Sequence, residues 1–135
     1  MITAIASAVL YVSNQDTALQ FYRDTLGFEL IMDADMGAGS RWLEVKPSGA
    51  QTSLVLASAE GFDRQPGEGA FLTFAADDVA ATVEQLRARG ATTSEVTREP
   101  WGTYATVDAP DGHKLQFNER PQRERGEPNL SSNHL

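Results

Sequence analysis

The 135-residue chain contains no cysteine. A disulfide framework, a thiolate metal site and a cysteine nucleophile are therefore excluded. Basic residues are scarce as well, because 11 Lys and Arg stand against 19 Asp and Glu, and the formal net charge is −8 at pH 7. Binding to nucleic acid or to an anionic membrane needs clustered Lys and Arg, so we expect neither as a partner. The negative charge fits a solvated protein surface.

Long apolar runs are also absent, and none approaches the roughly 20 residues of a membrane span. The amino-terminal Met-Ile-Thr-Ala-Ile has no basic region of the kind that opens a secretory signal. We therefore expect a cytoplasmic protein. At 135 residues the chain is one domain by size and buries roughly two-thirds of its unfolded surface, which is enough to fold without a disulfide or a structural metal.

The chain contains a unit that occurs twice. In the first copy, the apolar run Val9–Val12 predicts a strand, and a helix with one apolar face follows until Gly27 stops it. Ser13 and Asp16 have the spacing of a capping box at the start of this helix. A weaker copy begins with the strand pattern of residues 71–76.

The second copy follows the same order of elements. Asp77 is predicted to cap its helix, which Gly90 stops. The Ala109–Gly112 turn is predicted to join the last two strands, because proline presets φ and glycine accepts a positive φ. Alternating segments predict three half-buried strands after each helix. They span residues 28–35, 40–46 and 52–57 in the first copy, and 93–98, 103–108 and 114–119 in the second.

We interpret residues 1–119 as one domain of two modules, which span about residues 1–60 and 68–119. The polar, turn-rich segment 58–69 connects the two modules. Residues 120–135 are polar and nearly without apolar side chains, so we expect a disordered tail or one that drapes over a neighbouring chain.

Two short segments carry a family resemblance, Phe21–Phe28 (FYRDTLGF) and Pro110–Gly112 (PDG). Together with the duplicated unit they resemble the vicinal oxygen chelate superfamily over about residues 5–119. That group contains glyoxalase I, the bleomycin-resistance proteins and the extradiol dioxygenases. The resemblance implies an α+β fold in which two βαβββ modules form a cupped mixed sheet with a ligand site in the concavity. It also implies a homodimer, and it says little about the reaction.

The resemblance makes the question of a metal site specific. Members with metal-dependent chemistry carry His, Glu or Gln at four matched positions, in the first and the last strand of each module. This chain has at those positions Ser7, Phe71, Gln116 and, depending on the register, Val55 or Ser53. Gln116 alone resembles a metal donor, and we expect no metal site and no cofactor. A divalent ion held by Gln116, Glu44 and solvent remains the alternative.

The two histidines do not change this expectation. His113 falls in the predicted turn, where we expect it to be exposed, and His134 is next to the carboxyl terminus. Neither position suits an interior metal ligand or the histidine of a Ser-His-Asp triad.

Aromatic and polar side chains instead occupy the predicted concave face. Alternation puts Trp42 and Glu44 on the face opposite Leu43 and Val45. Flat apolar groups with a few polar ones are typical of small-molecule pockets, and aromatic rings also attract cations. The candidate ligand-binding residues are Trp42, Glu44, Phe71, Trp101, Tyr104, Gln116 and Ser7, with Thr106 and Asn118 on the same face. Core packing or a dimer interface would explain the same aromatic residues.

Three hypotheses of function remain open. The first is a metal-free small-molecule-binding protein of the bleomycin-resistance kind, which holds an aromatic or cationic compound in the cup. The second is an enzyme, either a glyoxalase-like lyase or dioxygenase with atypical metal ligands, or a metal-free isomerase with Glu44 as its general base. The third is a non-catalytic interaction module. The sequence does not identify the ligand, and it leaves open whether the modules pair within one chain or between two.

Overall fold

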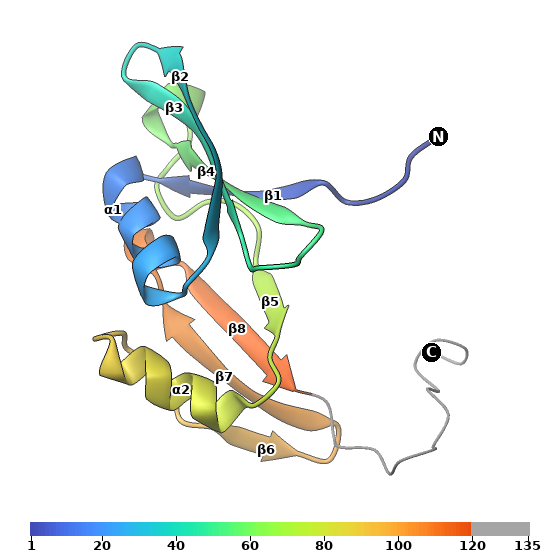
Figure 1. The fold of residues 1–135 in the computed structure, drawn as a ribbon. Helices are drawn as coiled ribbons and strands as arrows, with labels where there is room; N and C mark the ends of the chain where they lie inside the picture. The colour runs from blue at the N-terminus through green and yellow to red at the C-terminus, as the bar shows by residue number, and fades with distance from the viewer. Residues whose placement is uncertain (120–135) are drawn as a thin grey trace.

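The computed structural model describes residues 1–119, and within them the predicted unit occurs twice (Figure 1). The first module contains β1 (Ser7–Val12), α1 (Gln15–Gln20), the π-helical turn η1 (Phe21–Thr25), β2 (Glu29–Gly37), β3 (Ser40–Lys46) and β4 (Ser53–Ser58). The second contains β5 (Leu72–Ala75), α2 (Val79–Ala88), β6 (Thr97–Glu99), β7 (Gly102–Asp108) and β8 (Lys114–Glu119). Two 3₁₀ turns complete the order, η2 (Glu60–Phe62) and η3 (Pro110–Gly112). The predicted tail 120–135 lies outside the described residues.

Each module forms its own four-stranded mixed sheet in the described part of the chain. The strand orders are β1-β4-β3-β2 and β5-β8-β7-β6, so the two sheets have the same topology. In both, the first strand pairs in parallel with the last, and the remaining pairs are antiparallel. The predicted α+β fold of two βαβββ modules is confirmed. None of the described helices has the length and apolar composition that crossing a membrane requires.

Asn14 caps α1, and its Oδ1 accepts a hydrogen bond from the Thr17 amide at 2.9 Å. The predicted capping box of Ser13 and Asp16 is therefore wrong. The Ser13 amide instead donates to Oδ2 of Asp111 at 3.0 Å, a contact across 98 positions that no local pattern reveals.

Asp78, one residue after the predicted cap, caps α2. Its Oδ1 accepts a hydrogen bond from the Ala81 amide at 3.0 Å. The prediction that Asp77 caps this helix is wrong by one residue, which is the usual uncertainty where two acidic residues adjoin a helix start. Gly27 and Gly90 both have positive φ, as the predicted stops require.

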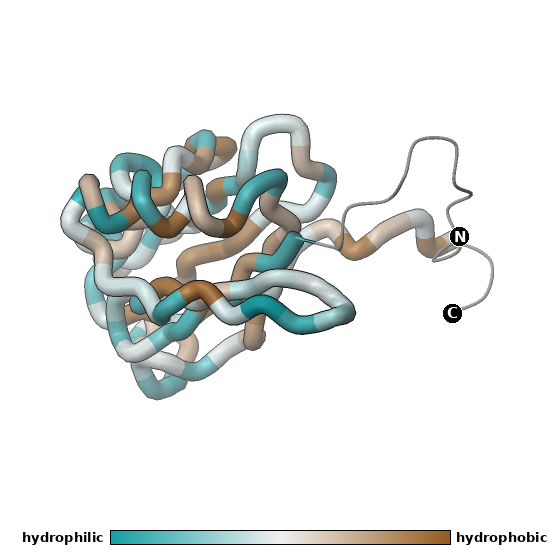
Figure 2. The backbone as a smooth tube through the Cα atoms, turned by 90° about the horizontal axis from the view of Figure 1, so that it is seen from below, coloured by the Kyte–Doolittle hydropathy of each residue, from teal (hydrophilic) through white to brown (hydrophobic). Residues whose placement is uncertain are grey.

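One hydrophobic core joins both modules and lies between the helices and the sheets. Leu10, Tyr22, Leu56 and Leu115 are among its fully buried side chains. In Figure 2 the apolar segments, coloured brown, pass through the body of the molecule, whereas many of the connecting loops are white or teal. The helix-covered faces of both sheets are thus used for folding, which leaves the opposite faces for other roles.

The connecting segment pairs with the outer edge of β1. The Tyr11 amide donates to the Glu68 carbonyl at 2.9 Å, and the Ala70 amide donates to the Val9 carbonyl at 3.0 Å. Gly69 is required here, because a Cβ at this position would lie 2.4 Å from the Val9 carbonyl oxygen and φ is +127°. The connection thereby occupies the β1 edge, and in the described residues β5 pairs with β8 alone.

His113 is buried, with 7% of its surface exposed, and the prediction of an exposed turn residue is wrong. Its Nε2–H donates to the Tyr11 carbonyl at 3.0 Å. The turn between β7 and β8 therefore packs against the first module. This contact crosses 102 positions of sequence, so the turn motif itself gives no sign of it.

All nine residues of β2 are exposed, and the prediction of a half-buried strand at this position is wrong for the single chain. The strand lies at the edge of its sheet and presents four large apolar side chains to solvent. They are Leu30, Ile31, Met32 and Met36. The strand predicted over 93–98 is shortened to β6, with a single bridge between Thr93 and Val107 before it.

The Tyr22 hydroxyl is buried and has no hydrogen-bond partner among the described residues. Burial raises the pKa of this hydroxyl above its ordinary value of 10.0, and the nearby Asp111 carboxylate raises it further. The folded state thus favours the neutral phenol, and its contribution to stability is lost as the pH rises above the pKa of an unfolded tyrosine.

We predict that Tyr22→Phe leaves the free energy of unfolding at pH 7 unchanged or raises it by up to about 1 kcal/mol, because it removes an unpaired polar group. Above about pH 10 the wild-type protein should lose more stability than the variant, since only the wild type has this buried tyrosine to ionise on unfolding. Urea denaturation of both proteins at neutral and alkaline pH measures the difference. A clear loss of stability in the variant at pH 7 would mean that the hydroxyl has a partner.

Candidate functional site

Strand register decides which predicted residues share a face of the first sheet. Glu44 on β3 is opposite Val55 on β4, and Trp42 precedes Glu44 by two positions. Cross-strand partners project to the same side of a sheet. Trp42 and Glu44 therefore lie on the face opposite the core residues Leu43 and Val45, as the alternation predicts.

The second sheet divides in the same way. Thr106 on β7 is opposite Gln116 on β8, and Tyr104 is opposite Asn118. Gln116 is also opposite Thr73 on β5. These side chains share the face away from α2, and the Gln116 amide donates to the Asn118 side-chain oxygen at 3.0 Å.

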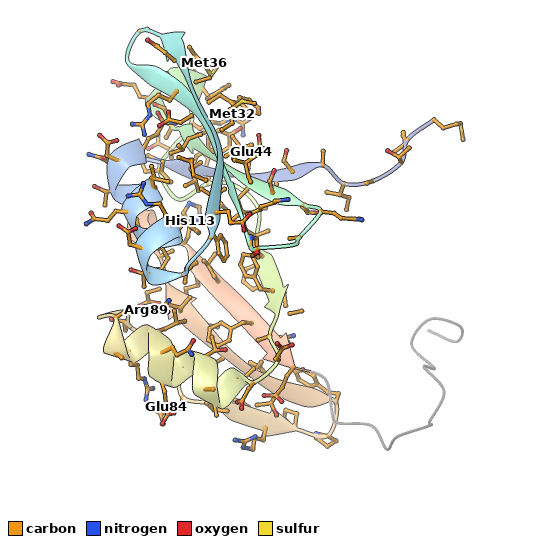
Figure 3. All side chains as sticks on the ribbon, in the orientation of Figure 1. Met32, Met36, Glu44, Glu84, Arg89 and His113 are labelled. Atoms are coloured by element: carbon orange, nitrogen blue, oxygen red, sulfur yellow. The ribbon has the colours of Figure 1, made fainter. Side chains whose placement is uncertain are left out.

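The Glu44 carboxylate, labelled in Figure 3, accepts a hydrogen bond at each of its oxygens. The Trp42 indole Nε1–H donates to Oε1 at 2.9 Å, and the Ser53 hydroxyl donates to Oε2. Ser53 is buried, whereas Trp42 and Glu44 are half-buried. An ionised carboxylate accepts roughly four hydrogen bonds, so a fixed negative charge with unused lone pairs remains on this face.

Trp101 and Tyr104 form a flat aromatic surface on the second module. Their rings are stacked, with centroids 5.3 Å apart and an angle of 11° between the planes. Trp101 is 60% exposed, although large aromatic side chains are usually covered. The stack is therefore available to a flat ligand or to another protein surface.

The structure brings the candidate residues together in two groups. Trp42 and Glu44 meet Ser53 on the first sheet, and Trp101 meets Tyr104 on the second. In residues 1–119, no hydrogen bond or aromatic contact connects the two groups.

The remaining candidates lie outside both groups. Phe71 precedes β5 and is 72% exposed, and Ser7 is half-buried at the start of β1, opposite Ser53.

The sequence does not predict the hydrogen bond between Ser53 and Glu44. The sequence points to Ser53 only as an alternative metal position on the fourth strand. The available signal was its position on the neighbouring strand near Glu44, but only the register between β3 and β4 decides which hydroxyl reaches the carboxylate.

The residues at the expected metal positions do not fit a divalent ion. When the two modules are aligned on their helix caps, Val9 corresponds to Thr73. Val9 pairs with Val55, and Thr73 pairs with Gln116. Val55 is therefore the counterpart of Gln116. The side-chain amide of Gln116 by itself does not hold a metal ion, because a bound metal needs three or four convergent ligands. In the part of the chain that the structure describes, no three His, Cys, Asp or Glu side chains are grouped to hold a metal ion.

Several known proteins are similar to this chain. An uncharacterized protein of Bacillus subtilis (strain 168), YetH, is 31% identical over 120 residues, which are 88% of this chain and all of YetH. The lactoylglutathione lyase of Haemophilus influenzae is 27% identical over 133 residues, which cover 90% of this chain and 96% of the lyase. The crystal structure of TnmS3, an antibiotic binding protein from Streptomyces sp. CB03234, is 34% identical with a TM-score of 0.78, covering 89% of this chain and 98% of TnmS3.

The family match extends over nearly all of the described residues. Residues 4–117 match the model of the Glyoxalase/Bleomycin resistance protein/Dioxygenase superfamily. The structural similarity to TnmS3 and the repeated βαβββ topology agree with this match. The chain therefore belongs to the Glyoxalase/Bleomycin resistance protein/Dioxygenase superfamily.

Proposed function

We propose that this protein binds a small aromatic or cationic compound without a metal ion, on the sheet face that carries Trp42 and Glu44. The observation that supports this most is the fixed carboxylate of Glu44, which two neutral donors orient and no cation neutralises among the described residues. A charge in this environment interacts strongly with a ligand cation, because partial burial reduces the screening by water.

The other candidate residues supply contact area and orientation. The Trp101–Tyr104 stack offers a plane on which a flat or cationic compound packs. Gln116 offers amide groups for hydrogen bonding, and Ser7 and Phe71 line the edges of their sheets. The net charge of −8 attracts a basic compound from solution.

Similarity to TnmS3 supports binding over catalysis. TnmS3 is described as an antibiotic binding protein and shares 34% of its aligned residues with this chain. The family as a whole hosts several chemistries, so family membership alone does not choose between binding and a reaction. The misfit of the metal positions weighs against a metal-dependent lyase or dioxygenase.

We further propose that the protein works as a homodimer. An exposed, apolar edge strand is a template for association with another chain, and β2 has four such side chains. The two groups of candidate residues are also not in contact within one chain. A second copy packed against β2 would cover the apolar strand and add its own aromatic surface to the site.

We predict that Trp42→Ala weakens the binding of proflavine, a flat aromatic cation, by about tenfold, because it removes both a ring surface and a donor to Glu44. Trp42→Phe is the matched control and should retain most of the affinity through its ring. Fluorescence titration of both variants measures the dissociation constants, and thermal denaturation checks that both remain folded. Equal affinity of wild type and Trp42→Ala, or no saturable binding of proflavine to the wild type, would contradict the proposed site.

We predict that Ile31→Glu, at a β2 position that is 44% exposed in the single chain, converts the protein from two chains to one 14.6 kDa monomer. A buried charge without a partner destabilises an interface. Ile5→Glu is the control, since Ile5 is also exposed and apolar but lies before β1. Sedimentation equilibrium measures the mass, and a monomeric wild type or a dimeric Ile31→Glu variant would exclude β2 as the dimer interface.

A further inference from the structure

A cavity of about 710 Å³ lies between the two modules and is lined in part by side chains of the hydrophobic core. Its deep walls are apolar and include Phe28, Leu54, Leu72, Phe74, Leu86 and Leu115. None of the residues proposed for the first site lines it. This inter-module cleft is therefore a separate feature of the molecule.

The fold explains why the cleft exists. One wall comes from the segment after η1 and the loop after β3, and the other comes from β5 and α2. Because the connection before β5 pairs with β1, β5 leaves that edge and the two modules separate at this point. The rings of Phe28 and Phe74 join the walls, with centroids 5.5 Å apart.

The charged side chains that line the cleft are all acidic. Two exposed carboxylates, Asp77 and Asp78, belong to the lining, and the lining contains no Lys, Arg or His. In residues 1–119 neither carboxylate forms an ion pair. Asp78 uses Oδ1 to cap α2 and keeps its second oxygen for another donor.

We propose that the inter-module cleft binds an amphiphilic amine, with an apolar body among the leucine and phenylalanine side chains and a cationic head at Asp77 and Asp78. The volume falls in the range of small-molecule sites, roughly 300–1,000 Å³, and the lining has their composition of many apolar groups and few polar ones. An anionic head is disfavoured, because no basic side chain would offset its repulsion by the two carboxylates. This site is independent of the proposed function, since the two share no residue.

The test uses three nine-carbon probes that differ in their head group: nonylamine, 1-nonanol and nonanoate. Methyl resonances of Leu72 and Leu86, recorded by NMR on the full chain, report occupation of the cleft. We expect nonylamine to shift them saturably and to bind about fivefold more tightly than 1-nonanol, which is the effect of one partly exposed ion pair. Nonanoate should bind most weakly.

Substitution of the carboxylates tests the role of charge. Asp77→Asn combined with Asp78→Asn should reduce the affinity for nonylamine to that for 1-nonanol, while asparagine preserves the cap of α2. Glu84→Gln is the matched control, because Glu84 carries a charge on α2 but does not line the cleft (Figure 3). This variant should bind nonylamine as the wild type does.

Filling the cleft tests its location. Ala81→Phe, from the α2 wall, should abolish binding of both nonylamine and 1-nonanol. Ala50→Phe, from the opposite wall, is used in its place if the first variant does not fold.

Three results would overturn the proposal: nonanoate binding as tightly as nonylamine, no saturable shift of the Leu72 and Leu86 methyl resonances, or unchanged binding after the carboxylates are removed. Shifts of the Leu72 and Leu86 methyls that depend on protein concentration in the Ile31→Glu variant, without any probe, would overturn it too, because a second copy would then fill the cleft in a protein that does not dimerise through β2.

Discussion

The backbone of Tyr11 connects the two halves of this molecule. Its amide donates to Glu68, and its carbonyl accepts hydrogen bonds from the Gly67 amide and from Nε2 of His113. These contacts attach both the connecting segment and the β7–β8 turn to β1. They also occupy the β1 edge, so β5 pairs only within its own module and each module has a separate sheet. The cleft between the modules follows from this arrangement.

The Glu44 site lies on a sheet face that does not contribute to the hydrophobic core. Folding uses the helix-covered faces, and the opposite face of the first sheet keeps a carboxylate oriented by Trp42 and Ser53. In the proposed function this carboxylate anchors a ligand cation, and the two hydrogen bonds orient both of its oxygens before a ligand binds. The aromatic stack of Trp101 and Tyr104 lies on the other module. A dimer that places one module's carboxylate beside another's aromatic surface would unite the two groups in one site.

Local sequence signals predicted those features that depend on neighbouring residues. The strand at Ser40–Lys46 and the strand at Lys114–Glu119 were predicted at their observed bounds, because alternation and turn residues define them. Contacts between distant segments were not predictable in this way. The burial of His113 requires a turn to meet β1, and the Ser53–Glu44 contact requires the register of two strands. The exposure of β2 was also missed, because alternating apolar and polar residues predict a half-buried strand, whereas β2 is an edge strand whose nine residues are all exposed.

Recognition of a ligand without a metal ion is the central claim, and it rests on Val55, Ser7 and Phe71 standing where a metal site would need ligands. The most direct test is elemental analysis of protein purified without a histidine tag, followed by calorimetric titration with Ni(II), Zn(II), Mn(II) and Fe(II). We expect no stoichiometric metal in the purified protein and no tight binding of any of the four ions. One tightly bound metal ion per chain would contradict the claim and would favour a metal-dependent enzyme.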